Sequence, residues 1–221
     1  MDISNKDLKR RIIEISYKKG LSHLGSCLTA VDIIKEVYDI KKPNEKFVLS
    51  SGHAGLALYC VLESFGGRNA EEIFDHHGVH PDRCSECGID CSSGSLGHGL
   101  PIALGMALVN RDRVSYCLIS DGECSEGSVW EALRIAREQY LTNLKIYFNF
   151  NNFSAYKEVD SHFIEWQIRK YLETSGPLSE GNPTLEFRYT TADYLPFLKG
   201  QIGHYKVMSE KEYIYAKNIL R

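Results

Sequence analysis

Two apolar segments on either side of an amphipathic one constrain the fold of this chain more than any other feature. Residues 114–120 (VSYCLIS) and 144–150 (LKIYFNF) are short runs rich in apolar and aromatic residues, as in buried strands. Between them, residues 126–140 place Val129 and Leu133 on one face of a helix. A strand, a helix and a second strand in this order predict a parallel βαβ unit. We therefore expect an α/β fold, a parallel sheet flanked by helices.

Further elements are expected on both sides of this unit. The patterns predict helices over residues 4–20, 53–62, 100–109, 163–172 and 209–220, and strands over residues 47–50 and 185–189. Thr29 and Asp32 form a capping pattern, which predicts another helix beginning at Thr29. Residues 67–99 are rich in Gly, Ser, His and Cys without periodicity, so we expect long loops there. Residues 1–221 are expected to form a single domain.

The composition excludes several classes of partner. Lys and Arg number 26 against 29 Asp and Glu, a net charge of −3, and no basic cluster could follow a nucleic-acid backbone. The longest apolar run, residues 100–109, contains Pro and Gly and is shorter than the roughly 20 residues that a membrane span needs. Residues 1–16 lack the apolar core of a secretory signal. With seven cysteines, reduced thiols in a cytoplasmic protein are expected.

Polar residues follow the predicted strands at the points where ligands bind in parallel sheets. Asp121 follows the first strand of the βαβ unit, Asn151 and Asn152 follow the second, and His53 follows the strand over residues 47–50. If the first two strands are neighbours, a carboxylate and an amide converge there, which suits Mg²⁺ bound to a diphosphate. The glycine-rich residues 94–99 precede a helix and offer backbone N–H groups to such a diphosphate. Alternatively, these polar residues only cap helices and turns.

A second cluster has the spacing of zinc ligands. Cys84 and Cys87 form a C-x-x-C pair, and His80 and Cys91 lie nearby in the chain. Zinc binding by these residues and unpaired thiols in a loop beside the cofactor site remain alternatives.

Several blocks resemble one enzyme family. Residues 120–152, SDGECSEGSVWEALRIAREQYLTNLKIYFNFNN, are similar to the thiamine diphosphate signature, which opens with Gly-Asp-Gly and closes with Asn-Asn. The blocks SSGHAGLALYCVL, HPDR, SSGSLGHGLPIALGMAL and DGECSEGSVWEA resemble the N-terminal half of transketolase, in the order of that family. The tail GHYKVMSEKEYIYAKNIL is similar to the end of the same domain. The resemblance implies the thiamine diphosphate-binding fold and, since the family often occurs as two chains, an N-terminal subunit of a split transketolase.

The resemblance implies a set of cofactor and metal ligands. Mg²⁺, or Ca²⁺ in its place, would be bound by the side chains of Asp121 and Asn152 and by the backbone carbonyl of Ser154. Thiamine diphosphate would contact the residues at the strand ends and in the glycine-rich loop. These are His53, Gly94, Ser95, Leu96, Gly97, Asp121, Gly122, Glu123 and Asn152.

The resemblance also implies catalytic residues and a partner. Histidines would handle the protons of a transfer of a two-carbon ketol unit from a ketose, such as a sugar phosphate, to an aldose: His23, His53, His80, His98 and His204. Glu126 and Glu131 match interface residues that link two active sites in the family. A glutamate that activates the cofactor belongs to a domain outside these residues. The implied partner is therefore a separate chain, the C-terminal transketolase subunit, and the implied assembly is a heterotetramer.

The sequence departs from the family pattern at two places. Ser120 replaces the first glycine of the signature, and the part after about residue 156 is shortened relative to the family. Two other functions therefore stay open. One is a non-catalytic binding or regulatory paralogue, and the other is a 2-oxo acid dehydrogenase-type thiamine diphosphate subunit.

Overall fold

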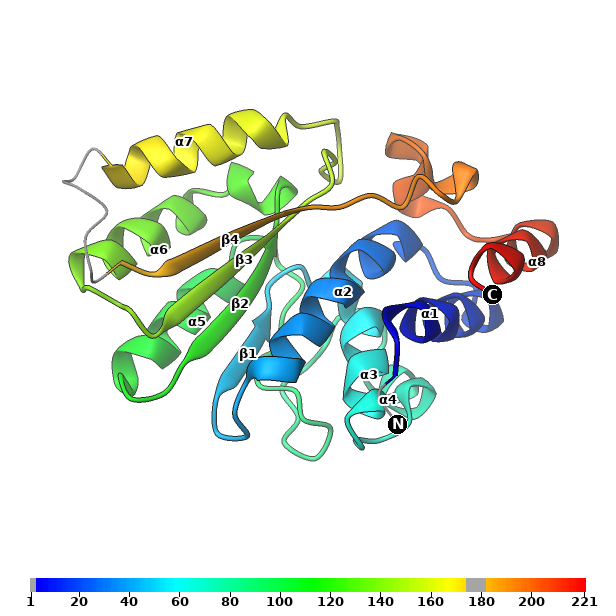
Figure 1. Cartoon of the computed structure of the whole chain (residues 1–221), viewed down its shortest axis with the longest axis horizontal. Helices are drawn as coiled ribbons and strands as arrows, with labels where there is room; N and C mark the ends of the chain where they lie inside the picture. The colour runs from blue at the N-terminus through cyan, green and yellow to red at the C-terminus, as the bar shows by residue number, and fades with distance from the viewer. Residues whose placement is uncertain (1–2, 174–181) are drawn as a thin grey trace.

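The centre of the molecule is a parallel sheet. The computed structural model describes residues 3–173 and 182–221, and its four-stranded sheet has the order β1-β2-β3-β4 (Figure 1). Its strands are β1 (Lys46–Leu49), β2 (Ser115–Ser120), β3 (Leu144–Phe150) and β4 (Thr184–Tyr189). Every pair of neighbours is parallel. The predicted α/β class and the predicted βαβ unit are confirmed, and β2 and β3 are direct neighbours.

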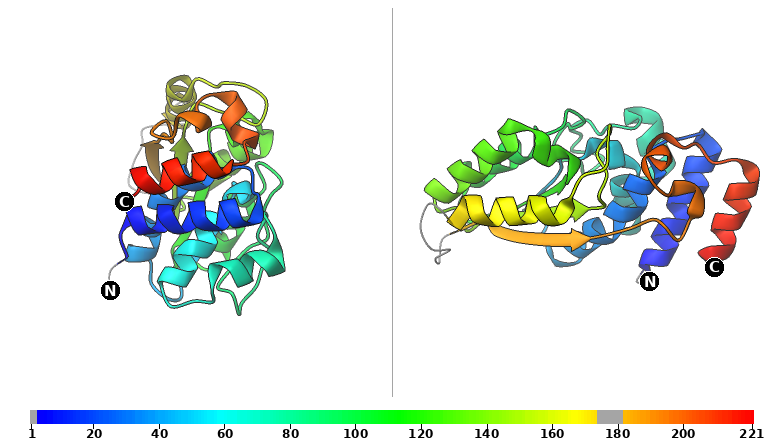
Figure 2. Two further views of the ribbon diagram at one scale, coloured as in Figure 1. Left: turned by 90° about the vertical axis from the view of Figure 1, so that its right-hand side faces the viewer. Right: turned by 90° about the horizontal axis from the view of Figure 1, so that it is seen from above.

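Helices cover both faces of this sheet (Figures 1 and 2). They are α1 (Asn5–Lys19), α2 (Leu24–Ile40), α3 (Gly55–Ser64), α4 (Ala70–His77), α5 (Gly99–Val109), α6 (Gly127–Glu138), α7 (Ser161–Glu173) and α8 (Glu210–Ile219). Short 3₁₀ helices are η1 (Gly52–Ala54), η2 (Gly122–Ser125), η3 (Pro196–Leu198) and η4 (Gln201–Tyr205). Among residues 3–173 and 182–221, no helix combines the length and the apolar character that crossing a membrane requires.

Strand β2 contributes to a separate core on each face of the sheet. Tyr116 and Leu118 pack in the core formed with α1, α2, α3 and α8, whereas Cys117 and Ile119 pack in the core formed with α5, α6 and α7. Successive side chains of a strand point to opposite faces. Both faces of β2 are therefore covered, which explains why its sequence is an unbroken apolar run rather than an alternating one.

The first and last helices have the caps that the sequence predicts. The Ser4 Oγ accepts a hydrogen bond from the Asp7 N–H at 3.2 Å, and α1 ends at Gly20 in the left-handed conformation (φ 63°). At α8, Ser209 and Glu212 form a complete capping box, which satisfies two N–H groups that the helix itself leaves unpaired. The predicted bounds of both helices are confirmed to within one or two residues.

The C-terminal tail returns to the beginning of the chain. Helix α8 lies beside α1 (Figure 2), where the rings of Tyr17 and Tyr213 stack with centroids 4.2 Å apart. Just before α8, the backbone carbonyl of His204 accepts a hydrogen bond from the His23 N–H at 3.1 Å. Packing of the tail therefore brings two histidines together that lie far apart in the sequence.

Two expectations about helices are wrong. Helix α2 begins at Leu24, not at Thr29, because Leu24, Cys27 and Leu28 are buried in the core and extend the helix through the capping pattern. The Thr29 hydroxyl instead donates to the Ser26 carbonyl within the helix, at 3.1 Å.

The second wrong expectation is that residues 67–99 form loops only. Helix α4 lies within them and is capped by Asn69, whose Oδ1 accepts from the Glu71 N–H at 2.9 Å. It buries only Ala70 and Ile73, which is too few apolar positions to show as a periodic pattern in the sequence.

Candidate functional site

A cavity of about 250 Å³ lies where β1, β2 and β3 end. The strands are parallel, so their carboxyl ends share one edge of the sheet, the usual place for ligands in such folds. Four of the predicted catalytic histidines line the cavity: His23, His53, His80 and His204. The other lining residues are Ser26, Gly94, Leu96, Ser120, Gly122, Asn151, Phe153, Ser154, Ala155, Tyr156 and Tyr205.

Asp121 is held rigidly at the end of β2. Its Oδ2 accepts hydrogen bonds from the N–H groups of Asn151 (2.9 Å) and Asn152 (2.7 Å) and from the Ser161 hydroxyl (2.8 Å). Its Oδ1 accepts only the Gly122 N–H, at 3.0 Å. Burial raises the pKa of the carboxyl group, and these hydrogen bonds oppose that rise. The carboxylate is thus fully oriented, and Oδ1 keeps capacity for one further partner. Asp121 is completely buried behind the cavity wall and does not itself line the cavity.

The two asparagines after β3 differ in where they lie. Asn151 is half-buried and lines the cavity, whereas the side chain of Asn152 is exposed and does not line it. Asn152 adopts the left-handed conformation (φ 67°), and its backbone N–H, not its amide, contacts Asp121. The Asn151 side-chain oxygen already accepts a hydrogen bond from the Phe153 N–H at 3.0 Å. The role of the Asn152 amide as a metal ligand stays a prediction.

Ser154 is buried at the cavity wall. Its backbone carbonyl accepts a hydrogen bond from the Gln201 side-chain amide at 3.0 Å, and the same amide also donates to the Ala155 carbonyl at 3.0 Å. Ser154, the predicted third ligand, lies near Gly122, because a Cβ added at Gly122 would lie 3.0 Å from the Ser154 Cα. The Ser154 carbonyl already has one hydrogen-bond partner.

Glu123 connects the strand ends to the glycine-rich loop. Its Oε1 accepts from the Ser50 hydroxyl (2.5 Å) and the Gly97 N–H (3.1 Å), and its Oε2 accepts from the Ser120 N–H (2.9 Å). The side chain is completely buried, and burial raises its pKa. Both carboxylate oxygens face protein donors, and the residue does not line the cavity, so contact of Glu123 with the diphosphate stays a prediction. Glu123 positions the loop.

The loop over residues 94–99 needs glycine at two points. Gly94 has φ 142°, and a Cβ there would lie 2.9 Å from the His80 ring. Gly97 has φ 77°, and a Cβ there would lie 2.6 Å from the Glu126 Cβ. Both positions combine a backbone conformation that favours glycine with close packing. In the same loop Leu96 lines the cavity, whereas Ser95 is exposed and does not line it.

Three imidazoles form a compact group on the cavity wall. The ring centroids of His23 and His204 are 4.8 Å apart, those of His23 and His53 5.4 Å, and those of His53 and His204 5.8 Å. Burial lowers the pKa of His53 to about 3 and that of His23 to about 4, and it also lowers the pKa of His204. All three rings are therefore neutral near pH 7, and each has one nitrogen that donates and one that accepts.

Three predicted residues lie away from the cavity. His98 is exposed at the start of α5 and does not line the cavity, so the structure does not bring it to the other catalytic candidates. Glu126 is exposed at the start of α6, and Glu131 is exposed on the same helix with Arg134 at 3.6 Å. Such a surface position is compatible with the predicted interface, which stays a prediction.

The zinc alternative involves other residues than the sequence suggests. The imidazole beside Cys84 and Cys87 is that of His77, whereas His80 lines the cavity. Cys91 packs in the core with α5 and α6, and its thiol donates to the Ser92 carbonyl at 3.0 Å.

Several cavity residues escape the motif analysis. Ser26 lies on α2, and Tyr205 follows His204 in η4, so neither follows a strand of the βαβ unit. Phe153 and Tyr156 come shortly after the asparagine pair. Their position just beyond the end of β3 is the sequence feature from which Phe153 and Tyr156 could have been predicted as cavity residues.

Comparisons with known proteins point to one enzyme family. The family model described as "Transketolase, thiamine diphosphate binding domain" matches residues 20–177. Transketolase-like protein 2 from Bos taurus is 36% identical over 172 residues, covering 68% of this chain and 27% of that protein. An apulose-4-phosphate transketolase subunit from Phocaeicola vulgatus is 33% identical over 164 residues, covering 65% of this chain and 58% of that protein.

Solved structures show the same fold. Transketolase from Campylobacter jejuni superimposes with a TM-score of 0.72 at 22% identity, covering 100% of this chain and 43% of the other. Transketolase from Leishmania mexicana gives 0.71 at 19% identity, covering 99% and 41%. The chain thus spans less than half of these enzymes and 58% of the P. vulgatus protein. By its match to the family model, this chain belongs to the transketolase family and contains its thiamine diphosphate-binding domain.

Proposed function

We propose that this chain is the N-terminal subunit of a transketolase-like enzyme that moves a two-carbon ketol unit from a ketose, such as a sugar phosphate, to an aldose. The observation that carries the proposal is the cavity at the strand ends, where three imidazoles lie with Gly122 and Asn151, whose N–H groups bind the buried Asp121. Thiamine diphosphate, when bound, supplies the carbon nucleophile that cleaves and remakes the carbon–carbon bond. Residues 1–221 would act as one domain, which the single sheet with a core on each face supports.

The residues at the end of β2 and β3 fit a divalent cation bound to a diphosphate. Asp121 offers one carboxylate oxygen with a single donor among the described residues. The amide ligand would be the exposed Asn152 side chain, since the Asn151 Oδ1 already accepts the Phe153 N–H. Such oxygen donors suit Mg²⁺, which takes its remaining ligands from phosphates and water, and also suit Ca²⁺. The carbonyl of Ser154 lies at the same wall. Gly122 would leave room for the diphosphate at the cavity wall.

The histidines fit the proton movements that the transfer requires. His23 Nδ1 is buried without a hydrogen-bond partner among the described residues, and the ring lines the cavity. A neutral imidazole can accept a proton at one nitrogen and donate from the other. We assign proton transfer at the substrate to His23, His53 and His204, and contact with substrate hydroxyl groups to His80.

The relatives support a separate partner chain. This chain covers 58% of a protein named as one subunit of a transketolase and 27% of a longer transketolase-like protein. We propose that a C-terminal subunit completes the enzyme as a heterotetramer, with Glu126 and Glu131 at the interface between the two sites.

Calorimetry of thiamine diphosphate with Mg²⁺ tests this function, with and without the C-terminal subunit. We expect Asp121→Asn and Asp121→Ala to abolish Mg²⁺-dependent cofactor binding, because neither side chain supplies the anionic oxygen. Asp112→Ala, at an exposed position before the amino end of β2 and thus at the opposite end of that strand from Asp121, is the control and should bind as the wild type does. Unchanged affinity in Asp121→Asn contradicts the site. No cofactor binding by the wild type, alone or with its partner, favours a non-catalytic subunit.

A further inference from the structure

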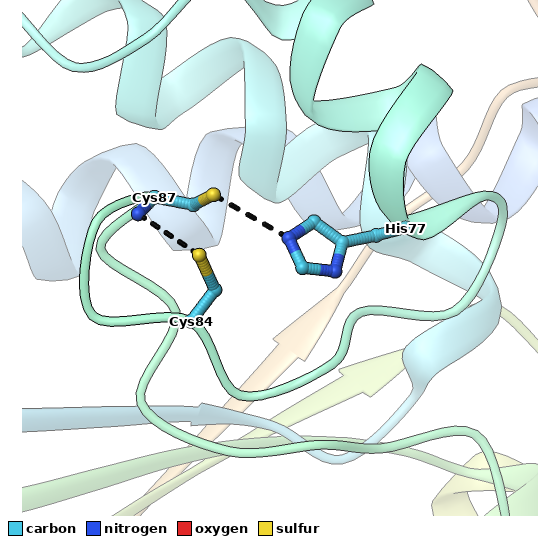
Figure 3. A group of neighbouring side chains, drawn as sticks. All are labelled: His77, Cys84 and Cys87. Atoms are coloured by element: carbon cyan, nitrogen blue, oxygen red, sulfur yellow. Dashed lines mark hydrogen bonds between the residues drawn. The ribbon is translucent and has the colours of Figure 1, made fainter.

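Outside the cavity, three side chains that bind soft metal ions face one another. His77 is the last residue of α4, and Cys84 and Cys87 belong to the loop that follows it (Figure 3). One potential ligand atom of each residue lies within 4.8 Å of those of the other two. The imidazole of His77 points at the Cys87 thiol, with 3.4 Å between Nε2 and Sγ.

The loop presents both thiols on one side of a tight turn. Cys84 and Ile89 form an antiparallel bridge with two hydrogen bonds of 2.9 Å, and Gly88 turns the chain with φ 78°. The Cys87 N–H donates to the Cys84 sulfur at 3.2 Å. A backbone N–H that points at a sulfur stabilises a thiolate there, so the turn is arranged for a C-x-x-C ligand pair.

We propose that His77, Cys84 and Cys87 bind one Zn²⁺, with water as the fourth ligand, as a clip that fastens this loop to α4. With zinc bonds of about 2.3 Å to sulfur and about 2.1 Å to nitrogen, tetrahedral geometry places the sulfur and the nitrogen about 3.6 Å apart. The His77–Cys87 separation is close to this value. On binding, the zinc displaces one proton from each thiol, and the two thiolates neutralise the charge of the ion. His77 and Cys84 are only half-buried, which leaves access for water.

The proposed zinc site is connected to the cavity by the segment between His77 and Cys84, which contains the cavity residue His80. His80 lies between His77 and Cys84 in the chain, and a Cβ at Gly94 would lie 2.9 Å from the His80 ring. Zinc binding would fix both ends of the segment between His77 and Cys84 and would therefore restrict the position of His80. The zinc lies outside the cavity and touches neither the cofactor nor the substrate, so its presence can be tested without an assay of the transferase.

Zinc titration of the purified full chain tests the proposal, after removal of metal by a chelator under reducing conditions. Elemental analysis should find one zinc per chain, and Co²⁺ in its place should give the absorption of thiolate coordination. We expect Cys84→Ser and Cys87→Ser to lose the bound equivalent. His77→Ala should weaken binding by at least about 100-fold, the upper end of what loss of an outer-shell partner costs.

Matched controls come from the same region. Cys91→Ser removes a thiol of the same segment that faces away from the cluster, and His76→Ala removes the exposed imidazole next to His77. Both should retain one zinc per chain. Absence of stoichiometric zinc and of a thiolate–cobalt band in the wild type overturns the proposal even if variants fail to fold. Equal loss of zinc in Cys91→Ser and Cys87→Ser overturns it as well.

Discussion

At the scale of single residues, substitution of His80 can distinguish an effect on turnover from an effect on cofactor binding. Its ring lines the cavity and packs against the Gly94 backbone, but it does not belong to the edge where Asp121 is clamped. We expect His80→Ala to lower kcat by about 10-fold, the effect of losing one hydrogen bond to a substrate hydroxyl group, with little change in the affinity for thiamine diphosphate.

Steady-state kinetics and calorimetry of the complex check this expectation for His80. His76→Ala, an exposed histidine of α4 that does not line the cavity, is the control and should leave both quantities unchanged. A collapse of cofactor affinity in His80→Ala, as large as the loss of turnover, contradicts the assigned role.

The asparagine pair shows what a motif can and cannot decide. The sequence places both residues directly after a strand, which locates them at the correct edge of the sheet. Which side chain turns inward depends on backbone dihedral angles, and Asn152 takes φ 67° while Asn151 lines the cavity. Adjacent residues can point their side chains in opposite directions. The Asn-Asn motif carries no information about which of the two side chains points into the cavity.

At the scale of elements, Glu123 fastens the glycine-rich loop to the ends of β1 and β2. We expect Glu123→Gln to lower the free energy of unfolding by about 1–3 kcal/mol, because one carboxylate oxygen is replaced by an amide that cannot accept from the donors around it. Those donors include the Ser50 hydroxyl and the Gly97 N–H. The displaced loop should also weaken cofactor binding.

Urea denaturation followed by circular dichroism measures the effect of Glu123→Gln. Glu138→Gln, at an exposed position that pairs with Arg134 at 2.7 Å, is the matched control and should change stability by less than about 1 kcal/mol, as for a surface ion pair. Similar losses in the two variants contradict the role given to Glu123.

Elements were predictable where the local pattern and the packing agree. The strands over residues 114–120 and 144–150 and the capped helix α8 follow from apolar runs and a capping box, and all three form. Helix α2 does not begin at its capping pattern, because burial of Leu24 and Leu28 outweighs a local cap. Helix α4 has too small an apolar face to be recognised.

At the scale of the whole molecule, the histidine cluster makes stability depend on pH. Burial lowers the pKa of His53 from 6.5 to about 3 and that of His23 from 6.5 to about 4. Between pH 6.5 and pH 4 the unfolded chain binds more protons than the folded one. The free energy of unfolding therefore decreases as pH falls from 6.5. We expect a decrease of about 3 kcal/mol by pH 4 from His53, and a smaller one from the half-buried His23, because solvent screens its charge.

Denaturation of the wild type and of His53→Gln across this range measures the contribution of His53. The variant should show a shallower dependence on pH below 6.5, because Gln does not titrate. His162→Gln, an exposed histidine on α7, is the control and should follow the wild type. Parallel curves for the wild type and His53→Gln contradict the burial of a neutral imidazole.

The parallel sheet, the edge where Asp121 and the asparagines meet, and the family could all be predicted from the amino-acid sequence. These features depend on periodicity and on strand ends, which are local properties of the chain. Three contacts became visible in the folded chain alone: His204 lies against His23, the Glu123 carboxylate faces protein donors, and His77 lies beside the two cysteines. Such contacts depend on how separate elements pack against each other, and no local pattern encodes the direction of a side chain across that packing.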